Sequence, residues 1–115
     1  NAGAWLWVLG FKVYGPDTVT LTRNEGRTEL IGGYFLPLSA PNAVPAHVID
    51  EAEASLIYAT RAHNQPDWDY GVQVRETRGG ETRQLLRSDV GKRDEQGSFV
   101  PLFLGHDRKV RVCHE

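Results

Sequence analysis

The segment of residues 70–89, YGVQVRETRGGETRQLLRSD, contains the most informative turn in this sequence. The glycine pair at 79–80 separates two stretches that alternate apolar or β-branched residues with polar ones, as strands do. A two-residue turn at these glycines fixes how the two strands pair. The resulting cross-strand pairs are Arg78 with Glu81, Thr77 with Thr82, Glu76 with Arg83, and Val74 with Leu85. Opposite charges, threonines and apolar residues all face each other in this one register, which predicts a β-hairpin.

Similar turns divide the rest of the sequence into short segments. Gly15-Pro16-Asp17 and Asn24-Glu25-Gly26 consist of residues that favour tight turns. The segments between such turns are rich in β-branched and aromatic residues, which are typical of strands. The strands expected on this basis cover residues 5–14, 18–23, 27–36, 56–61, 70–78, 81–89, 99–104 and 109–113.

The turn at residues 24–26 predicts a second hairpin. A two-residue turn at Glu25-Gly26 sets Leu21 opposite Leu30, and facing apolar pairs of this kind stabilise a sheet. In the strand that follows, Gly32-Gly33 predicts a bulge, because glycine within a strand often marks one.

Prolines at positions 37, 41 and 45 exclude a central strand from residues 37–45, because proline cannot donate a hydrogen bond to a neighbouring strand. We expect a loop here that crosses between two hairpin-rich halves. Residues 46–55 then give the best candidate helix in the sequence. Pro45 suits the first helical position, and the apolar residues at 48, 49 and 52 share one helix face.

These segments predict a mainly β protein. We expect about eight short antiparallel strands in a sandwich or a small barrel, with one short helix at residues 46–55. The alternative is an α+β fold, in which that helix is longer and packs on a curved antiparallel sheet. Residues 1–115 fit a single domain, with Asn1-Ala2 as the remnant of a tag. The sequence has no residue-level repeat.

Composition excludes several classes of protein. Of the 115 residues, 40% are hydrophobic and 24% are charged, and the net charge is −2, which argues against disorder and against a nucleic-acid-coating protein. No apolar run approaches the roughly 20 residues of a membrane helix. The single cysteine excludes an internal disulfide framework and a four-cysteine zinc site. It is compatible with a cytoplasmic protein, which is the compartment we favour.

The segment HNQPDWDY at residues 63–70 combines groups that can ligate, donate and accept beside two aromatic rings. An exposed tryptophan flanked by polar side chains suits a small polar ligand. The ligand-binding residues expected on this basis are Asn64, Trp68, Asp69 and Tyr70.

The same segment allows two other sites and one plain alternative. Asn64, Asp67 and Asp69 offer hard oxygen ligands to a metal such as Ca²⁺, although the spacing matches no known loop. For catalysis, His63 would act as general base, oriented by Asp67 or Asp69. Alternatively the segment is only a hairpin loop, because asparagine, proline and aspartate are common turn residues.

The remaining candidates point to structure rather than to a site. Trp5 and Trp7 share one strand face, and we expect them in the core or, in an open barrel, lining a cavity. The arginines of residues 75–87 are expected on a salt-bridged sheet surface. His106 and Cys113-His114 are expected in a solvated turn and at the chain end. His47 is expected near solvent.

No nucleotide, hydrolase or metalloprotease motif occurs in the sequence, and no cofactor is indicated. Our leading hypothesis is therefore a non-enzymatic binding or interaction module that presents loops to a protein or a small polar ligand. The first alternative is a small enzyme with an aromatic-lined pocket that uses His63 with Asp67 or Asp69. The second is a self-associating structural subunit, for instance a homodimer formed through an uncovered strand edge at residues 99–104.

Overall fold

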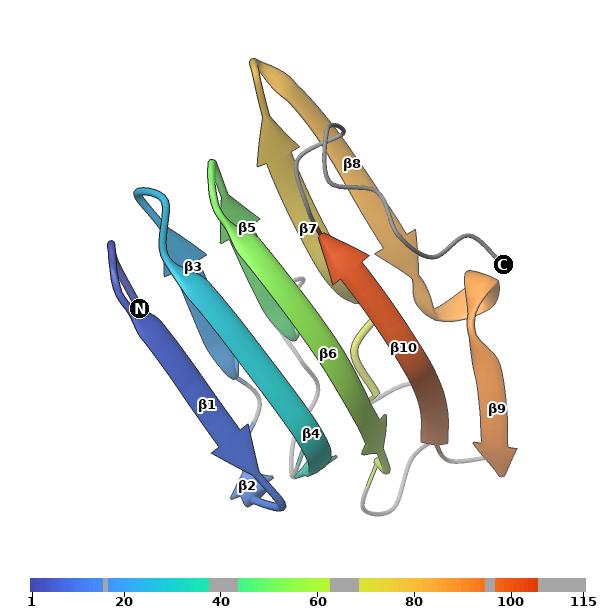
Figure 1. The fold of residues 1–115 in the computed structure, drawn as a ribbon. Coiled ribbons are helices and arrows are strands. Elements are labelled where there is room, and N and C mark those ends of the chain that lie inside the picture. The colour runs from blue at the N-terminus through green and yellow to red at the C-terminus, as the bar shows by residue number, and fades with distance from the viewer. Residues whose placement is uncertain (16, 38–43, 63–68, 95–96, 106–115) are drawn as a thin grey trace.

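The computed structural model describes residues 1–15, 17–37, 44–62, 69–94 and 97–105, and these form two mixed β-sheets packed face to face (Figure 1). The mainly β, two-layer prediction is confirmed, and the sheets do not close into a barrel. The first sheet contains β1 (Trp5–Leu9), β2 (Lys12–Tyr14), β4 (Arg27–Leu36), β6 (Glu53–Thr60), β10 (Gly97–Gly105) and β9 (Gly91–Asp94). The second contains β3 (Thr20–Arg23), β5 (His47–Asp50), β7 (Val72–Arg78) and β8 (Glu81–Leu86).

From β2 to β7 the chain passes alternately through the two sheets, and β1 precedes β2 in the first sheet. Each strand lies parallel to the strand one coil earlier, as in a β-solenoid. In the second sheet Thr22 lies beside Ile49 and Ile49 beside Glu76, so each coil there adds 27 residues (22 to 49 to 76). The prediction of antiparallel strands is therefore wrong for five of the eight strand pairs of the described residues.

The winding ends at the hairpin of β7 and β8, which is antiparallel, as are the pairs of β10 with β6 and with β9. All four cross-strand pairs predicted around Gly79-Gly80 are confirmed. A 3₁₀ turn, Arg87–Asp89, then leads from the second sheet to β9 in the first.

The hairpin predicted at residues 24–26 is wrong, because β3 and β4 belong to different sheets. Asn24 and Glu25 have φ values of 53° and 62°, in the left-handed region, and they turn the chain through a corner. Leu21 pairs with Val48 instead of Leu30. The crossing loop predicted at residues 37–45 stays a prediction, because residues 38–43 lie outside the described part of the chain. The strands on either side of it, β4 and β5, belong to different sheets.

The helix predicted at residues 46–55 is also wrong, and with it the α+β alternative. This stretch forms β5, a corner at Glu51 with φ of 48°, and the start of β6. Alternate residues of β6 are buried: Ala54, Leu56, Tyr58 and Thr60. As a strand, this segment buries every second side chain and is hydrogen-bonded on both edges, to β4 and to β10. Together these contacts stabilise the strand more than local helix propensity stabilises a helix.

The core lies between the sheets and includes Leu30, Phe35, Ile49, Leu56, Tyr58 and Val74. The bulge predicted at Gly32-Gly33 is confirmed by a register shift between β4 and β6. Glycine is required at both positions: Gly32 has φ of +81°, and a Cβ at Gly33 would lie 2.7 Å from the Phe35 ring. Within the described residues, no helix has the length and apolar character to cross a membrane.

Candidate functional site

Most of the predicted loop site falls outside the described residues. The structure does not describe His63, Asn64, Asp67 and Trp68, so the ligand, metal and catalytic roles predicted for them stay predictions. The same holds for His106 and Cys113-His114. Among the residues that the structure does describe, no three His, Cys, Asp or Glu side chains are grouped so that they could hold a metal ion.

Asp69 is described, and its side chain is fully buried. One carboxylate oxygen accepts a hydrogen bond from the Tyr70 backbone N–H at 2.8 Å. The other accepts from the Ser98 hydroxyl of β10 at 2.7 Å and lies 3.6 Å from Nε of Arg87. These contacts give Asp69 a structural role, since they fasten the segment that precedes β7 to the opposite sheet.

Tyr70 is buried as well. Its hydroxyl donates to the backbone oxygen of Asp17 at 2.5 Å, and burial raises the pKa of Tyr70 to about 12. Its backbone oxygen accepts from the Gln73 side chain, whose amide oxygen in turn accepts from Tyr58. The ring is thus enclosed by the fold and does not lie on a surface where a ligand could stack.

His47 lies in the core and not near solvent, contrary to the sequence-based expectation. Its Nδ1 is 2.6 Å from the hydroxyl of Thr20, and its ring packs edge-on against Phe35 and Tyr58. Within the described part of the chain, Nε2 is buried and has no hydrogen-bond partner. Burial lowers the pKa of His47 to about 3, so the imidazole is neutral at neutral pH.

The most unusual exposed surface surrounds β1. Trp5, Trp7 and Leu9 lie on the outer face of the first sheet with 67%, 66% and 72% of their surface exposed. The expectation that the tryptophans fill the core is therefore wrong. The two side chains share a face, as period two requires, but Val8 is the residue of this strand that packs toward the core.

On β4, Ile31 lies beside Leu9 and is 50% exposed, so it extends the same apolar area. We call these four residues, Trp5, Trp7, Leu9 and Ile31, the β1 surface. Arg27 borders it, with its guanidinium carbon 4.4 Å from the centre of the Trp5 ring, and pairs on its other side with Glu53.

The β1 surface adjoins an open strand edge. Among the described strands, β1 pairs with β4 alone, so its second edge is unpaired. Natural proteins commonly protect such edges with charged residues or proline, and β1, with the sequence WLWVL, has neither.

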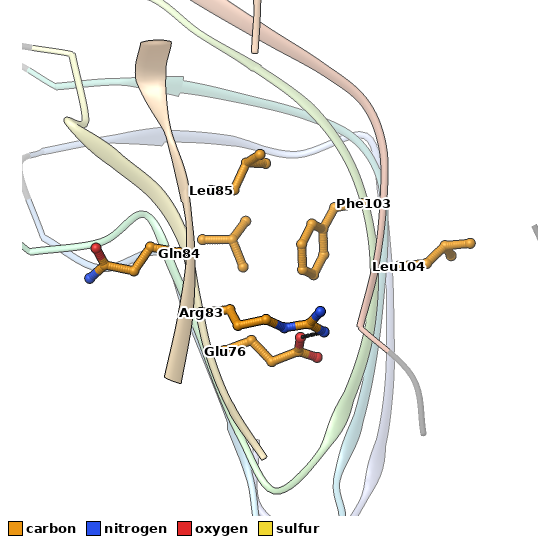
Figure 2. A pocket seen from close by; sticks show the side chains of 7 residues that line it. Glu76, Arg83, Gln84, Leu85, Phe103 and Leu104 are labelled. Atoms are coloured by element: carbon orange, nitrogen blue, oxygen red, sulfur yellow. Dashed lines mark hydrogen bonds and ion pairs between the residues drawn. The ribbon is translucent and has the colours of Figure 1, made fainter. Parts of the chain in front are cut away.

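A cleft of about 300 Å³ lies at the other end of the molecule, between the β7–β8 hairpin and β10. Its lining residues are Val74, Glu76, Arg83, Gln84, Leu85, Phe103 and Leu104. Figure 2 shows Arg83, Leu85 and Phe103 projecting into the cleft, whereas Gln84 and Leu104 point away from it.

Glu76 forms the floor of the cleft, with 5% of its side chain exposed. One carboxylate oxygen accepts from Nη2 of Arg83 and the other from Nη2 of Arg78, both at 3.0 Å. Arg78 also donates to the backbone oxygen of Ala52 at 2.6 Å. The predicted pairing of Arg83 with Glu76 is confirmed, but this pair is partly buried and does not form the open sheet surface that we expected.

Comparison with known proteins gives no relative: no family model, no curated protein and no solved structure matches this chain. The function must therefore be inferred from the β1 surface and the cleft themselves.

Proposed function

We propose that this chain is a non-enzymatic interaction module whose partner is a second copy of itself, bound through the open edge of β1. The observation that carries the proposal is the exposure of two tryptophans beside an unpaired strand edge. Large exposed apolar patches mark interaction surfaces in monomeric proteins, and an unpaired edge is a template for another strand.

The sequence of β1 fits a second copy. In an antiparallel pair centred on Trp7, Trp7 lies opposite Trp7 of the other copy, and Trp5 lies opposite its Leu9. These residues then share the outer face of one continuous sheet. Leu6 and Val8 pair on the inner face, so every cross-strand pair is apolar.

Self-pairing also avoids an electrostatic cost. No residue of β1 is charged, so two copies meet along the edge without like charges facing each other. Each copy presents the same patch, which gives a closed two-fold contact. The backbone N–H and C=O groups of the free edge gain hydrogen-bond partners, and the indole rings leave water.

The first test is the effect of Trp7→Lys on self-association. We expect the wild-type chain to sediment as a dimer at micromolar concentrations. The variant should weaken the dimer by roughly 100-fold or more, because the contact between the two indole rings is lost and the two lysines face each other as like charges. Leu102→Lys is the matched control, since Leu102 is 49% exposed but lies on β10, two strands away from β4. A wild-type chain that is monomeric at several hundred micromolar, or equal losses in both variants, contradicts the proposal.

A second test addresses the register of the pairing. In a Cys113→Ser background, Trp7→Cys should give an intermolecular disulfide on oxidation, because position 7 faces itself. Trp5→Cys should not, since the two copies of position 5 are offset by four residues, about 13 Å along the strand. Efficient cross-linking at position 5 but not at position 7 would exclude this register.

A further inference from the structure

The cleft between the β7–β8 hairpin and β10 is independent of the β1 surface. β8 extends the second sheet and β10 belongs to the first, so the cleft opens where the two layers separate. Its volume, about 300 Å³, is at the lower end of the range for small-molecule sites. At roughly 30 Å³ for each non-hydrogen atom, the share of a water molecule in the liquid, it holds about ten such atoms.

The walls of the cleft are apolar. Leu85 lies on one side and Phe103 of β10 on the other (Figure 2), and Val74 also lines the cleft. Val74 and Leu85 also face each other in the hairpin register, so the strand pairing fixes that side of the cleft. Walls of this kind select a ligand with an apolar body.

The floor of the cleft carries the charge. Glu76 supplies one negative charge, and Arg78 and Arg83 each supply a positive one at 3.0 Å from it. Only Glu76 and Arg83 of these three residues line the cleft, and Arg78 pairs with the other carboxylate oxygen of Glu76 from outside the lining. Glu81 lies opposite Arg78 at the hairpin tip and does not line the cleft.

Arg83 is the group that can meet a ligand. Its side chain remains 71% exposed, and its hydrogen bond to Glu76 uses Nη2. A guanidinium has five N–H donors in a planar fork that matches a carboxylate. The bond to Glu76 engages Nη2, and the Arg83 side chain projects into the cleft (Figure 2).

Gly105 indicates that the floor is closely built. A Cβ at Gly105 would lie 2.7 Å from a carboxylate oxygen of Glu76 and 3.1 Å from the end of the Ile49 side chain. Glycine therefore allows the last residue of β10 to approach the buried carboxylate of Glu76 closely.

We propose that this cleft binds a small carboxylic acid with an aromatic or aliphatic body of about ten non-hydrogen atoms. The carboxylate pairs with Arg83, and the body lies between Leu85 and Phe103. No covalent step is involved. This proposal does not depend on self-association through β1.

The test uses 3-phenylpropionate as the probe and its neutral amide as the matched ligand, followed by NMR of the full chain. We expect the acid to bind with a dissociation constant in the millimolar range or below, as for a ligand of this size. The shift changes should centre on Leu85 and Phe103. The amide should bind at least about tenfold more weakly, because it lacks the charge that pairs with Arg83.

Two variants decide the role of the arginine. Arg83→Gln should weaken binding of the acid about tenfold and leave binding of the amide unchanged. Arg75→Gln should change neither, because Arg75 lies on the same hairpin but pairs with Gln84, which points away from the cleft. Equal binding of acid and amide, shift changes elsewhere on the chain, or no binding at 10 mM (about ten times the expected constant) would each overturn the proposal.

Discussion

Replacing Asp69 with alanine is expected to lower the free energy of unfolding by about 3–5 kcal/mol. The substitution leaves the Tyr70 backbone N–H and the Ser98 hydroxyl without their acceptor, and each unsatisfied buried group costs about 1–3 kcal/mol. It also removes the carboxylate that lies 3.6 Å from Arg87. The loss should be visible as a lower midpoint in urea unfolding with an unchanged slope.

Asp50→Ala is the control for this prediction. Asp50 ends β5 and is exposed, so its replacement should change the stability by less than about 0.5 kcal/mol. The comparison also separates the structural role of Asp69 from the ligand role expected from its sequence. A residue whose only role is to bind a ligand often lowers the stability of the folded protein. A chain that becomes more stable when Asp69 is replaced would therefore favour the ligand role.

The sequence predicts those parts of the fold that depend on neighbours along the chain. The β7–β8 register follows from residues a few positions apart, and it is correct at every predicted pair. The solenoid depends on contacts 27 residues apart, such as Thr22 with Ile49 and Ile49 with Glu76. These three residues differ in type, so the coil leaves no repeat in the sequence although it repeats in space.

The turns at residues 24–26 and 50–51 show why the sequence did not predict the solenoid. Asn24-Glu25-Gly26 has the composition of a hairpin turn, and a hairpin and a corner both require left-handed residues. What distinguishes them is whether the next strand returns to the same sheet. Likewise, the acidic residues 50–51 resemble a helix start, but Glu51 turns the chain between two parallel layers.

The cleft could have been partly inferred from the alternation of β7. Glu76 follows Val74 by two residues on β7, so both side chains lie on the inward face of the strand. A buried glutamate requires cationic partners. Phe103 could not have been added, because nothing local to β10 shows that it lies across from Leu85. Similarly, period two places Trp5 and Trp7 together but does not decide which face they occupy.

The stability of the protein is expected to fall as the pH falls from 7 to 5, by about 2 kcal/mol, because of His47. In the folded protein, burial lowers the pKa of His47 to about 3 from 6.5. Between these two values the unfolded chain binds a proton at this position and the folded chain does not. The free energy of unfolding therefore rises with pH across this window and levels off above pH 6.5. Urea unfolding at pH 5, 6 and 7 measures the slope.

His47→Phe tests the origin of that slope. Phenylalanine keeps an aromatic ring against Phe35 and Tyr58 and removes the unpartnered Nε2, and it cannot titrate. The variant should lose most of the pH dependence between 5 and 7, whatever its absolute stability, because the hydroxyl of Thr20 that loses its partner has no charge to change. A slope that persists in the variant would assign the acid sensitivity to other groups. A slope that disappears would show that a neutral, enclosed histidine at the centre of the coil limits the pH range in which the fold is most stable.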